Sequence, residues 1–183
     1  MNALDTPVSY EALAAIGSGL GSAGFVVFDD ADDLVAVTAG ASRFLAIESC
    51  GQCTPCKLDG QRISELLAAV STNSAAPNHV EELRTRVAKV ADGARCSLAT
   101  QHQVIAASLL DNYSADVDAH VEKRSPGIQP LLVAELVGID AGVARSDAHH
   151  ADKQPDWSYD RIDSGKTPAE RLGEHRDPLA LDD

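Results

Sequence analysis

The hydrophobic and polar positions of this 183-residue chain predict a mainly helical protein. Apolar residues recur at helical spacing in four segments, which start near Leu34, Ile63, Val80 and Leu98. Residues that favour turns separate these segments. The pattern therefore predicts a small four-helix bundle over residues 34–113, in which short loops join antiparallel helices.

Residues 1–33 predict a lead-in to this bundle. A helix-like stretch over residues 10–16 is followed by a glycine-rich run and a short apolar strand over residues 25–28. A dinucleotide-binding fingerprint needs its glycine loop to follow a strand and to open a helix. Here the loop precedes the strand, so we interpret it as a turn and not as a nucleotide site. The glycines that spell G-x-G-x-x-G are Gly19, Gly21 and Gly24.

Four aspartates follow the predicted strand. They could be a divalent-metal site, but Asp32 or Asp33 is also a good N-cap for the next helix. Negative charge is favourable at a helix N-terminus, so the capping interpretation is preferred. The four residues are Asp29, Asp30, Asp32 and Asp33.

The C-terminal part changes character. Residues 128–147 predict a β-hairpin, because apolar runs at 131–137 and 142–144 flank a turn at 138–141. Residues 148–183 are polar and predict a tail that is extended, disordered or laid along another subunit, with Trp157 and Tyr159 as isolated apolar anchors. His149 and His150 could bind a metal, although such a pair in a polar tail is usually solvated.

Composition and charge narrow the possible functions. The net charge of −13 argues against a nucleic-acid partner, since phosphate binding needs a basic surface. Aromatic residues make up only 4% of the chain, so the core must be built mainly from Leu, Val, Ile and Ala. A core of that kind is light, and bound metal would then supply a real share of the folding free energy.

The sequence also predicts a soluble, cytoplasmic protein without direct membrane insertion. Met1 is followed by neither a basic nor an apolar signal region. No run of about 18 apolar residues occurs in the chain.

Cysteine spacing is the strongest chemical signal. Cys50, Cys53 and Cys56 form C-x2-C-x2-C, and Cys96 lies beyond two predicted helices. Three thiolates from one loop and a distant fourth suit a 4Fe-4S cluster. Both cysteine-bearing loops would lie at one end of an antiparallel bundle, because the two helices between them run out and back.

Other roles for the four cysteines stay open at this point. Structural zinc usually takes its four cysteines as two C-x2-4-C pairs, which fits less well. Disulfides are disfavoured because the three clustered cysteines are too close in sequence and nothing suggests export. Free thiols are the remaining alternative.

The motif resembles a known family, the C-terminal iron-sulfur domain of the NADH-binding flavoprotein subunit of respiratory complex I. Related diaphorase subunits of NAD-reducing hydrogenases and formate dehydrogenases share it. The likeness covers residues 3–113: residues 48–56 read E-S-C-G-Q-C-T-P-C, residues 95–98 read R-C-S-L, and residues 19–30 read G-L-G-S-A-G-F-V-V-F-D-D. In that family the matching cysteines hold a 4Fe-4S cluster that takes electrons from a flavin reduced by NADH. The resemblance implies four ligands: Cys50, Cys53, Cys56 and Cys96.

This chain departs from the family in two ways. The family's NADH- and FMN-binding domain and its ubiquitin-like domain do not fit before residue 3, so we expect no NADH or FMN site and no hydride chemistry on this polypeptide. The family also tends to follow its third cysteine with Arg-x-Gly, whereas here Lys57 follows and the glycine is shifted to Gly60. Lys57, Arg62 or Arg95 could favour a reduced cluster, although each is also explained as a solvated surface residue, and for Arg62 that explanation is preferred.

Three classes of function follow. The first is an electron-transfer subunit or domain that relays electrons between a flavin- or NADH-binding oxidoreductase subunit and other iron-sulfur subunits. The complex would be of the NADH-dehydrogenase, formate-dehydrogenase or hydrogenase kind. The alternative is a non-catalytic assembly module with a structural cluster. A redox or oxygen sensor is disfavoured, because no DNA-binding element is evident. No residue is predicted to be a catalytic acid, base or nucleophile.

Overall fold

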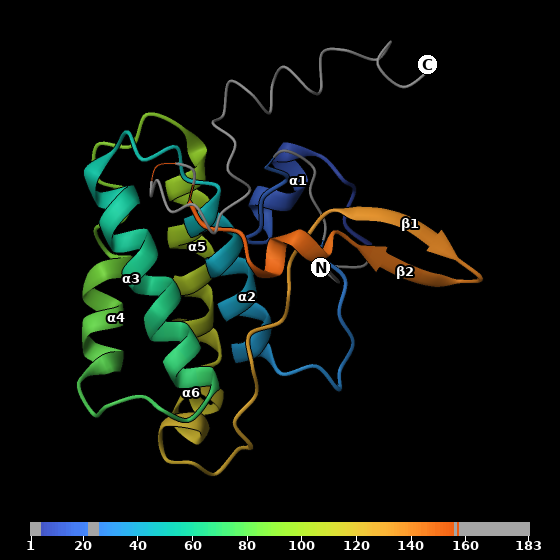
Figure 1. Ribbon diagram of the computed structural model, residues 1–183. Coiled ribbons are helices and arrows are strands. Elements are labelled where there is room, and N and C mark those ends of the chain that lie inside the picture. Colours follow the sequence, from blue (N-terminus) through green and yellow to red (C-terminus); the bar gives the residue numbers. More distant parts are fainter. Residues whose placement is uncertain (1–4, 22–25, 156, 158–183) are drawn as a thin grey trace.

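The computed structural model describes residues 5–21, 26–155 and 157, and it confirms the mainly helical prediction (Figure 1). Within these residues the chain forms six α-helices and one two-stranded antiparallel sheet. None of these helices has an apolar stretch long enough to cross a bilayer. The helices are α1 (Tyr10–Ala15), α2 (Leu34–Ile47), α3 (Thr54–Ser71), α4 (His79–Val87), α5 (Ser97–Asn112) and α6 (Ser114–Val121).

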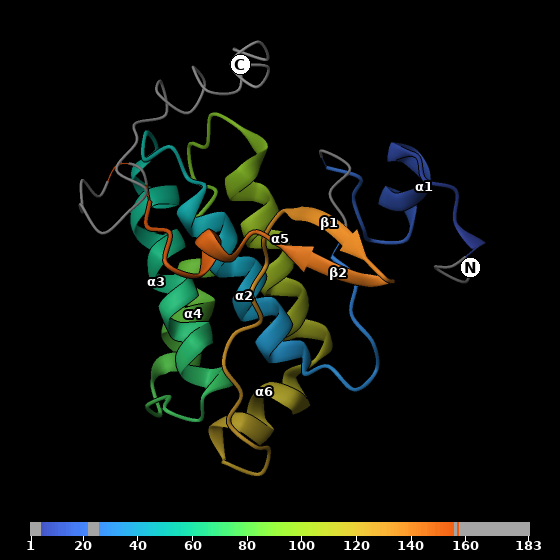
Figure 2. The ribbon, with the colours of Figure 1, turned by 45° about the vertical axis from the view of Figure 1, so that its right-hand side comes forward.

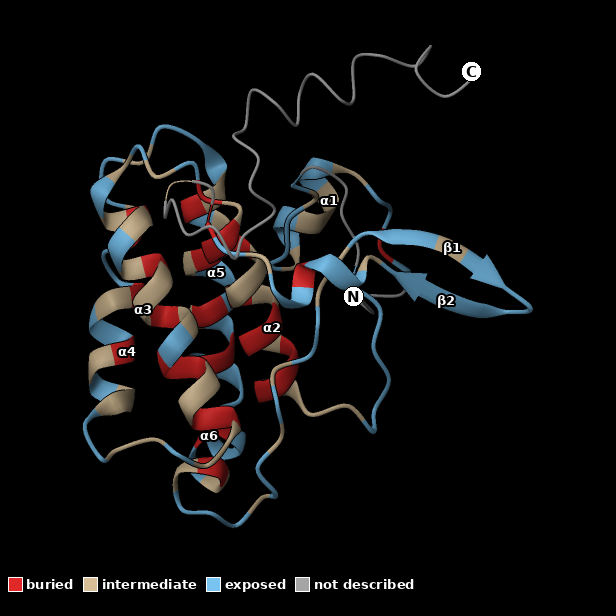
Figure 3. Cartoon of the chain, viewed as in Figure 1, coloured by how far each residue is buried: buried red, intermediate tan, exposed pale blue. Residues whose placement is uncertain are grey.

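Helices α2 to α6 share one hydrophobic core. Figure 3 shows that buried positions gather on the sides of these helices that face one another. Aliphatic side chains and alanines make up this core, as the composition predicted. The core residues are Val35, Ala39, Ile63, Leu66, Leu67, Val70, Leu83, Val87, Val90, Ala106, Leu109, Leu110 and Val117.

The direction of the helices decides where the loops lie. Helix α2 runs toward the cysteine-rich loop, α3 runs away from it, α4 returns and α5 runs away again (Figures 1 and 2). The loop between α2 and α3 and the loop between α4 and α5 therefore lie at the same end of the helical body. The short helix α6 lies at the opposite end.

The residue before a helix caps it with a side-chain hydrogen bond at α2 but not at α4. The Asp33 side chain accepts a hydrogen bond from Ala36 N at 2.9 Å, which confirms Asp33 as the N-cap of α2. Its other carboxylate oxygen lies 2.9 Å from Nε2 of the buried His120. Asn78 precedes α4, and although asparagine is favoured as an N-cap, its side chain makes no capping hydrogen bond.

The predicted N-terminal strand is wrong for the residues that can be described. Val26, Val27 and Phe28 have no strand structure and are exposed, Val27 by 92%. A strand needs a neighbour for its backbone hydrogen bonds. The sheet of the described chain contains only β1 and β2. The last glycine of the G-x-G-x-x-G run, Gly24, lies outside the described residues.

The C-terminal hairpin is present, but its turn lies further along the chain than predicted. Strand β1 (Leu136–Asp140) pairs antiparallel with β2 (Val143–Ser146). Ala141 and Gly142 form the turn with φ of +50° and +82°, the signs of a type I′ turn. The preceding apolar residues instead run along α2, where Leu131 N donates to Ala36 O at 3.0 Å.

The first residues after the hairpin also differ from the expected extended tail, whereas residues 158–183 of that tail lie outside the described residues. Residues Ala148–Ala151 form a 3₁₀ helix that returns to the C-terminal half of α2. The guanidinium of Arg43 donates hydrogen bonds to the backbone oxygens of this segment, and His150 is buried. These contacts were not visible in the sequence, because they join residues more than one hundred positions apart.

Candidate iron-sulfur site

Three of the candidate ligands surround the start of α3. Cys50 lies in the loop before the helix, Cys53 is the N-cap, and Cys56 lies in the first turn. Pro55 occupies the first turn, where its fixed φ suits a helix and its missing N–H costs nothing. Gly51, with φ of +71°, turns the chain between the first two cysteines.

The fourth candidate ligand, Cys96, is the N-cap of α5. Neither Cys53 nor Cys96 caps its helix with a side-chain hydrogen bond. Backbone N–H groups at a helix start lack partners within the helix and carry partial positive charge. Two such starts therefore favour an anionic group bound between the cysteine-bearing loops.

The thiols differ in exposure, and the electrostatic influence of the other three acts on Cys56. Cys56 is buried, Cys53 is half-buried, and Cys50 and Cys96 are exposed, and none forms a disulfide. Burial raises the pKa of the Cys56 thiol, the Ser49 hydroxyl lowers it, and the charges of the other three cysteines raise it further.

This donor set fits a 4Fe-4S cluster. Four thiolates drawn from two loops are the usual ligands of such a cluster: its iron ions offset the repulsion among the thiolates, and the thiolate-bound cluster as a whole stays anionic. No group of three or more His, Cys, Asp or Glu side chains in the described part of the chain is already arranged around a single metal ion.

Ser49 supports the loop in a way that the sequence did not reveal. Its hydroxyl lies 3.4 Å from the Cys56 sulfur and accepts a hydrogen bond from Gly51 N at 3.3 Å. The Gly51 N–H group therefore donates its hydrogen bond to Ser49 and not to a cysteine sulfur. Ser49 belongs to the E-S-C string, and that string was the only sign of its importance.

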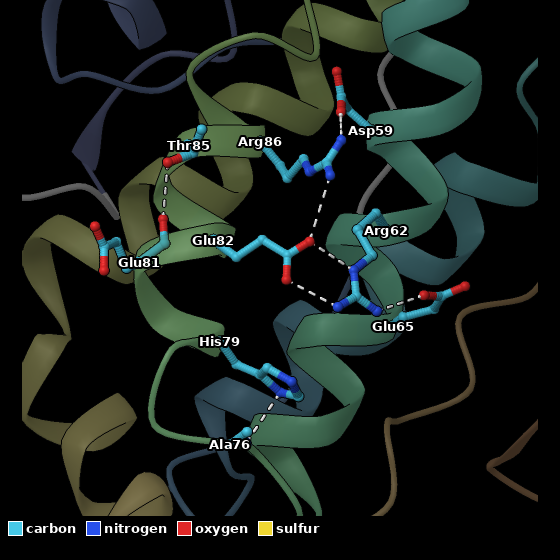
Figure 4. A network of polar contacts seen from close by, with 9 residues as sticks. All are labelled: Asp59, Arg62, Glu65, Ala76, His79, Glu81, Glu82, Thr85 and Arg86. Carbon is cyan, nitrogen blue, oxygen red and sulfur yellow. Dashed lines mark hydrogen bonds and ion pairs between the residues drawn. The ribbon is translucent and has the colours of Figure 1, made fainter.

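The basic residues near the motif have separate roles. Lys57 places its ammonium 4.2 Å from the centre of the Trp157 ring. Arg62 instead bonds to Glu82 at 2.9 Å and to Glu65 at 3.0 Å, and these bonds raise its pKa (Figure 4). Arg62 therefore ties α3 to α4, which favours a structural role over an effect on a cluster.

Two weaker metal candidates are not formed. His149 is 98% exposed and contacts Asp147, whereas His150 is buried and stacks on Phe44 with ring centroids 5.6 Å apart. Asp29 and Asp32 accept backbone hydrogen bonds within their own turn. Neither the histidine pair nor these aspartates belongs to a metal-binding group in the described chain.

Comparison with known proteins gives the same result as the motif. Residues 36–120 match a family described as the NADH-ubiquinone oxidoreductase-F iron-sulfur binding region. Within these residues the chain is similar to that iron-sulfur binding region. The resemblance drawn from the sequence is thereby confirmed over these residues, and so is the predicted cofactor, a 4Fe-4S cluster.

Individual relatives belong to oxidoreductases of two kinds. The chain is 31% identical over 121 residues to NADP-reducing hydrogenase subunit HndC of Solidesulfovibrio fructosivorans, an alignment that covers 66% of this chain and 25% of the relative. It is 29% identical over 121 residues to an NADH-quinone oxidoreductase subunit of Rhizobium meliloti (strain 1021), an alignment that covers 66% of this chain and 29% of the relative. The chain thus spans less than a third of the length of either relative.

Proposed function

We propose that this chain is a 4Fe-4S electron-transfer subunit or domain. It relays electrons between a flavin- or NADH-binding oxidoreductase subunit and other iron-sulfur centres. The complex is of the NADH-dehydrogenase, formate-dehydrogenase or hydrogenase kind. The observation that carries this proposal is that the cysteine-bearing starts of α3 and α5 lie at the same end of the helical body, within the residues that match the iron-sulfur binding region.

The ligands are Cys50, Cys53, Cys56 and Cys96. When bound, a 4Fe-4S cluster supplies a one-electron redox couple. The protein holds the thiolates on two rigid helix starts and places the Ser49 hydroxyl beside the buried Cys56. The exposed Cys50 and Cys96 mark the side at which a partner's redox centre can approach.

The fold agrees with this assignment. In the proposal, α2 to α5 form the bundle and the cluster lies at the end where both cysteine-bearing loops meet. The cluster then joins the α2–α3 loop to the α4–α5 loop, so its binding free energy also stabilises the fold. Reduced thiolates need a reducing compartment, which supports the predicted cytoplasmic location.

The names of the relatives support a partner of this kind. Their names describe a hydrogenase component and a quinone oxidoreductase component. We therefore propose that the electron donor is a flavoprotein and that the acceptor is a further iron-sulfur protein of the same complex.

The test is anaerobic purification followed by iron and sulfide analysis, with EPR spectra before and after dithionite. We expect about four irons and four sulfides per chain and a signal that appears on reduction. Cys96→Ser should lower the iron content and abolish that signal, because it removes the distant ligand. Ser97→Ala, which changes the next residue but no ligand, should leave both unchanged.

Two results would contradict the proposal. Zinc in place of iron would exclude electron relay. A cluster that dithionite cannot reduce would favour the alternative, an assembly module in which the cluster is structural.

A further inference from the structure

The segment after the hairpin is fixed to the helix that leads into the cysteine loop. Arg43 on α2 donates hydrogen bonds to the backbone oxygens of His150 at 2.7 Å, Ala151 at 2.8 Å and Lys153 at 3.2 Å. The His150 ring stacks on Phe44, one residue further along α2. Three carbonyl groups held by one guanidinium fix the course of this segment, residues 147–153, which we call the strap.

The strap leads toward the candidate ligands. Lys153 forms an ion pair with Glu48, the residue that ends α2 two positions before Cys50. Four residues further on, Trp157 reaches the cysteine loop itself. Residues separated by about a hundred positions in the sequence are therefore adjacent at this site.

Trp157 packs directly on Gly51. A Cβ atom on Gly51 would lie 2.6 Å from the indole Cδ1 and 2.7 Å from Cγ, so the ring occupies space that only glycine leaves open. The ammonium of Lys57 lies 4.2 Å from the ring centroid on a residue that directly follows Cys56. The indole is thus held between the loop that carries Cys50 and Cys53 and the first turn of α3.

The indole nitrogen has no partner in this environment. Nε1 is buried and is the one side-chain nitrogen or oxygen atom in the described residues that is buried without a hydrogen bond. An unpaired buried donor loses its hydrogen bonds to water without replacement, so proteins rarely retain one. Nε1 is covalently bonded to Cδ1, the indole atom nearest to Gly51, which places the donor beside the cysteine loop.

We propose that Trp157 is a positioning residue of the iron-sulfur site. Its indole covers the cysteine loop, and its N–H donates a hydrogen bond to a sulfur atom of the cluster or of a ligating cysteine. This inference rests on the proposed function, because the acceptor is the bound cluster. Trp157 lies beyond residues 36–120, the range that matches the family, so this contact is a feature of this chain's own C-terminal segment.

The proposed hydrogen bond has a direct electrochemical consequence. Reduction adds negative charge to the cluster, so an N–H donor at sulfur stabilises the reduced state more than the oxidised state. The nearby Lys57 ammonium acts in the same direction. The indole also keeps water from the loop, which slows loss of the cluster.

The first experiment uses Trp157 as its own probe, because it is the only tryptophan in the chain. In the cluster-loaded protein we expect weak, blue-shifted emission that acrylamide quenches poorly. Arg43→Gln should shift the emission to the red and increase quenching, since it removes the donor that holds the strap. Removal of the iron with a chelator should then raise the wild-type emission, because the cluster beside the indole no longer quenches it.

The second experiment distinguishes the effect of the indole N–H group from the effect of the aromatic ring. Trp157→Phe keeps an aromatic ring but removes the donor, whereas Trp157→Ala removes both. We expect Trp157→Phe to retain the wild-type iron content and to lower the reduction potential, measured by EPR-monitored titration. A tenfold shift in the oxidised-to-reduced ratio, about 59 mV for one electron, is the upper limit expected. Trp157→Ala should in addition lose its cluster faster in air.

The outcomes distinguish this inference from the proposed function. A wild-type chain that binds no iron but shows buried, protected tryptophan emission would overturn the electron-relay function and the donor role together, while leaving the strap in place. A reducible cluster whose potential is the same in wild type and Trp157→Phe would overturn the donor role alone. A reducible cluster with red-shifted, readily quenched emission would show that the indole does not cover the loop.

Discussion

The helical body and the β-hairpin of this protein are stabilised in different ways. In the body, Ile63 and Leu66 of α3 are 0% exposed, whereas Ile139 of β1 is 65% exposed. Figure 3 shows the hairpin pale along nearly all of its length and the facing sides of the helices buried. The body is held by burial of shared apolar surface, while the hairpin depends on its own backbone hydrogen bonds and turn.

This difference matters for the iron-sulfur site. Both cysteine-bearing loops start from helices that contribute to the core, so ligand binding and helix packing support each other. The hairpin contributes no residue to that core among the described residues. Changes in the body should therefore affect stability and cofactor together, and changes in the hairpin should affect neither.

The largest effect is expected from loss of a ligand. Cys53→Ser should abolish the brown chromophore and much of the fold, because the cluster binds only the folded arrangement of its ligands. The absorbance spectrum and the helical circular dichroism signal measure the two effects. Ser146→Ala, on the exposed strand β2, is the control and should change neither. Near-native helicity and stability in Cys53→Ser would argue against this coupling.

A smaller effect is expected from truncation in the core. Leu66→Ala should lower the free energy of unfolding by about 3 kcal/mol, since it removes buried methyl groups and leaves a cavity. Ile139→Ala, on the hairpin, should change it by no more than about 0.5 kcal/mol. Urea unfolding, followed by circular dichroism, measures the free energy of unfolding of both variants. Equal losses in the two variants would show that the hairpin shares the stability of the body.

The pH dependence of stability should come from the body. His102 is buried, with Nε2 2.6 Å from the Ser42 hydroxyl, and burial lowers its pKa to about 4. The unfolded state, with an ordinary histidine pKa of about 6.5, binds the proton first as pH falls. The contribution of His102 to the free energy of unfolding is therefore present at neutral pH and is lost as the pH falls from about 6.5 to 4.

Between pH 7.5 and pH 5 this linkage should lower the free energy of unfolding by about 2 kcal/mol. His102→Gln should remove that part of the pH dependence in urea unfolding. His149→Gln, at a side chain that is 98% exposed, should keep it. An unchanged pH profile in His102→Gln would exclude this histidine as the source.

The smallest effects are expected from ion pairs. Arg62 joins α3 to α4 through two bonds to Glu82, whereas the Arg145–Asp140 pair on the hairpin is more than 60% exposed on both sides. Arg62→Gln should lower the thermal unfolding midpoint slightly, and Arg145→Gln should leave it unchanged, because solvent screens an exposed pair. If Arg145→Gln lowered the thermal unfolding midpoint more than Arg62→Gln, the hairpin pair would contribute more to stability than the pair in the helical body.

Local features were predictable where a residue's neighbours in sequence decide them. The stripes that start at Leu34, Ile63, Val80 and Leu98 all became helices, and Asp33 caps α2. The hairpin was predictable as a motif, but its turn was placed too early. The positive φ angles of Ala141 and Gly142 place the turn and so fix the pairing register of β1 and β2. The apolar content of the segment alone does not indicate where the turn lies.

Contacts between distant segments were not predictable. The strand expected at residues 25–28 has no partner in the described sheet. The hydrogen bonds from Arg43 to the strap span more than one hundred residues, and no local pattern indicates them. The position of Trp157 on Gly51 depends on those bonds and on a glycine that leaves room for the ring.

The sequence by itself determined the helical segments and the four-cysteine motif, since helical periodicity and C-x2-C spacing act over a few residues. Only the tertiary structure decided that Ser49 supports Cys56 and that the strap brings Trp157 onto the loop. The physical reason is that these contacts exist only after apolar burial has set the direction of α2 to α5.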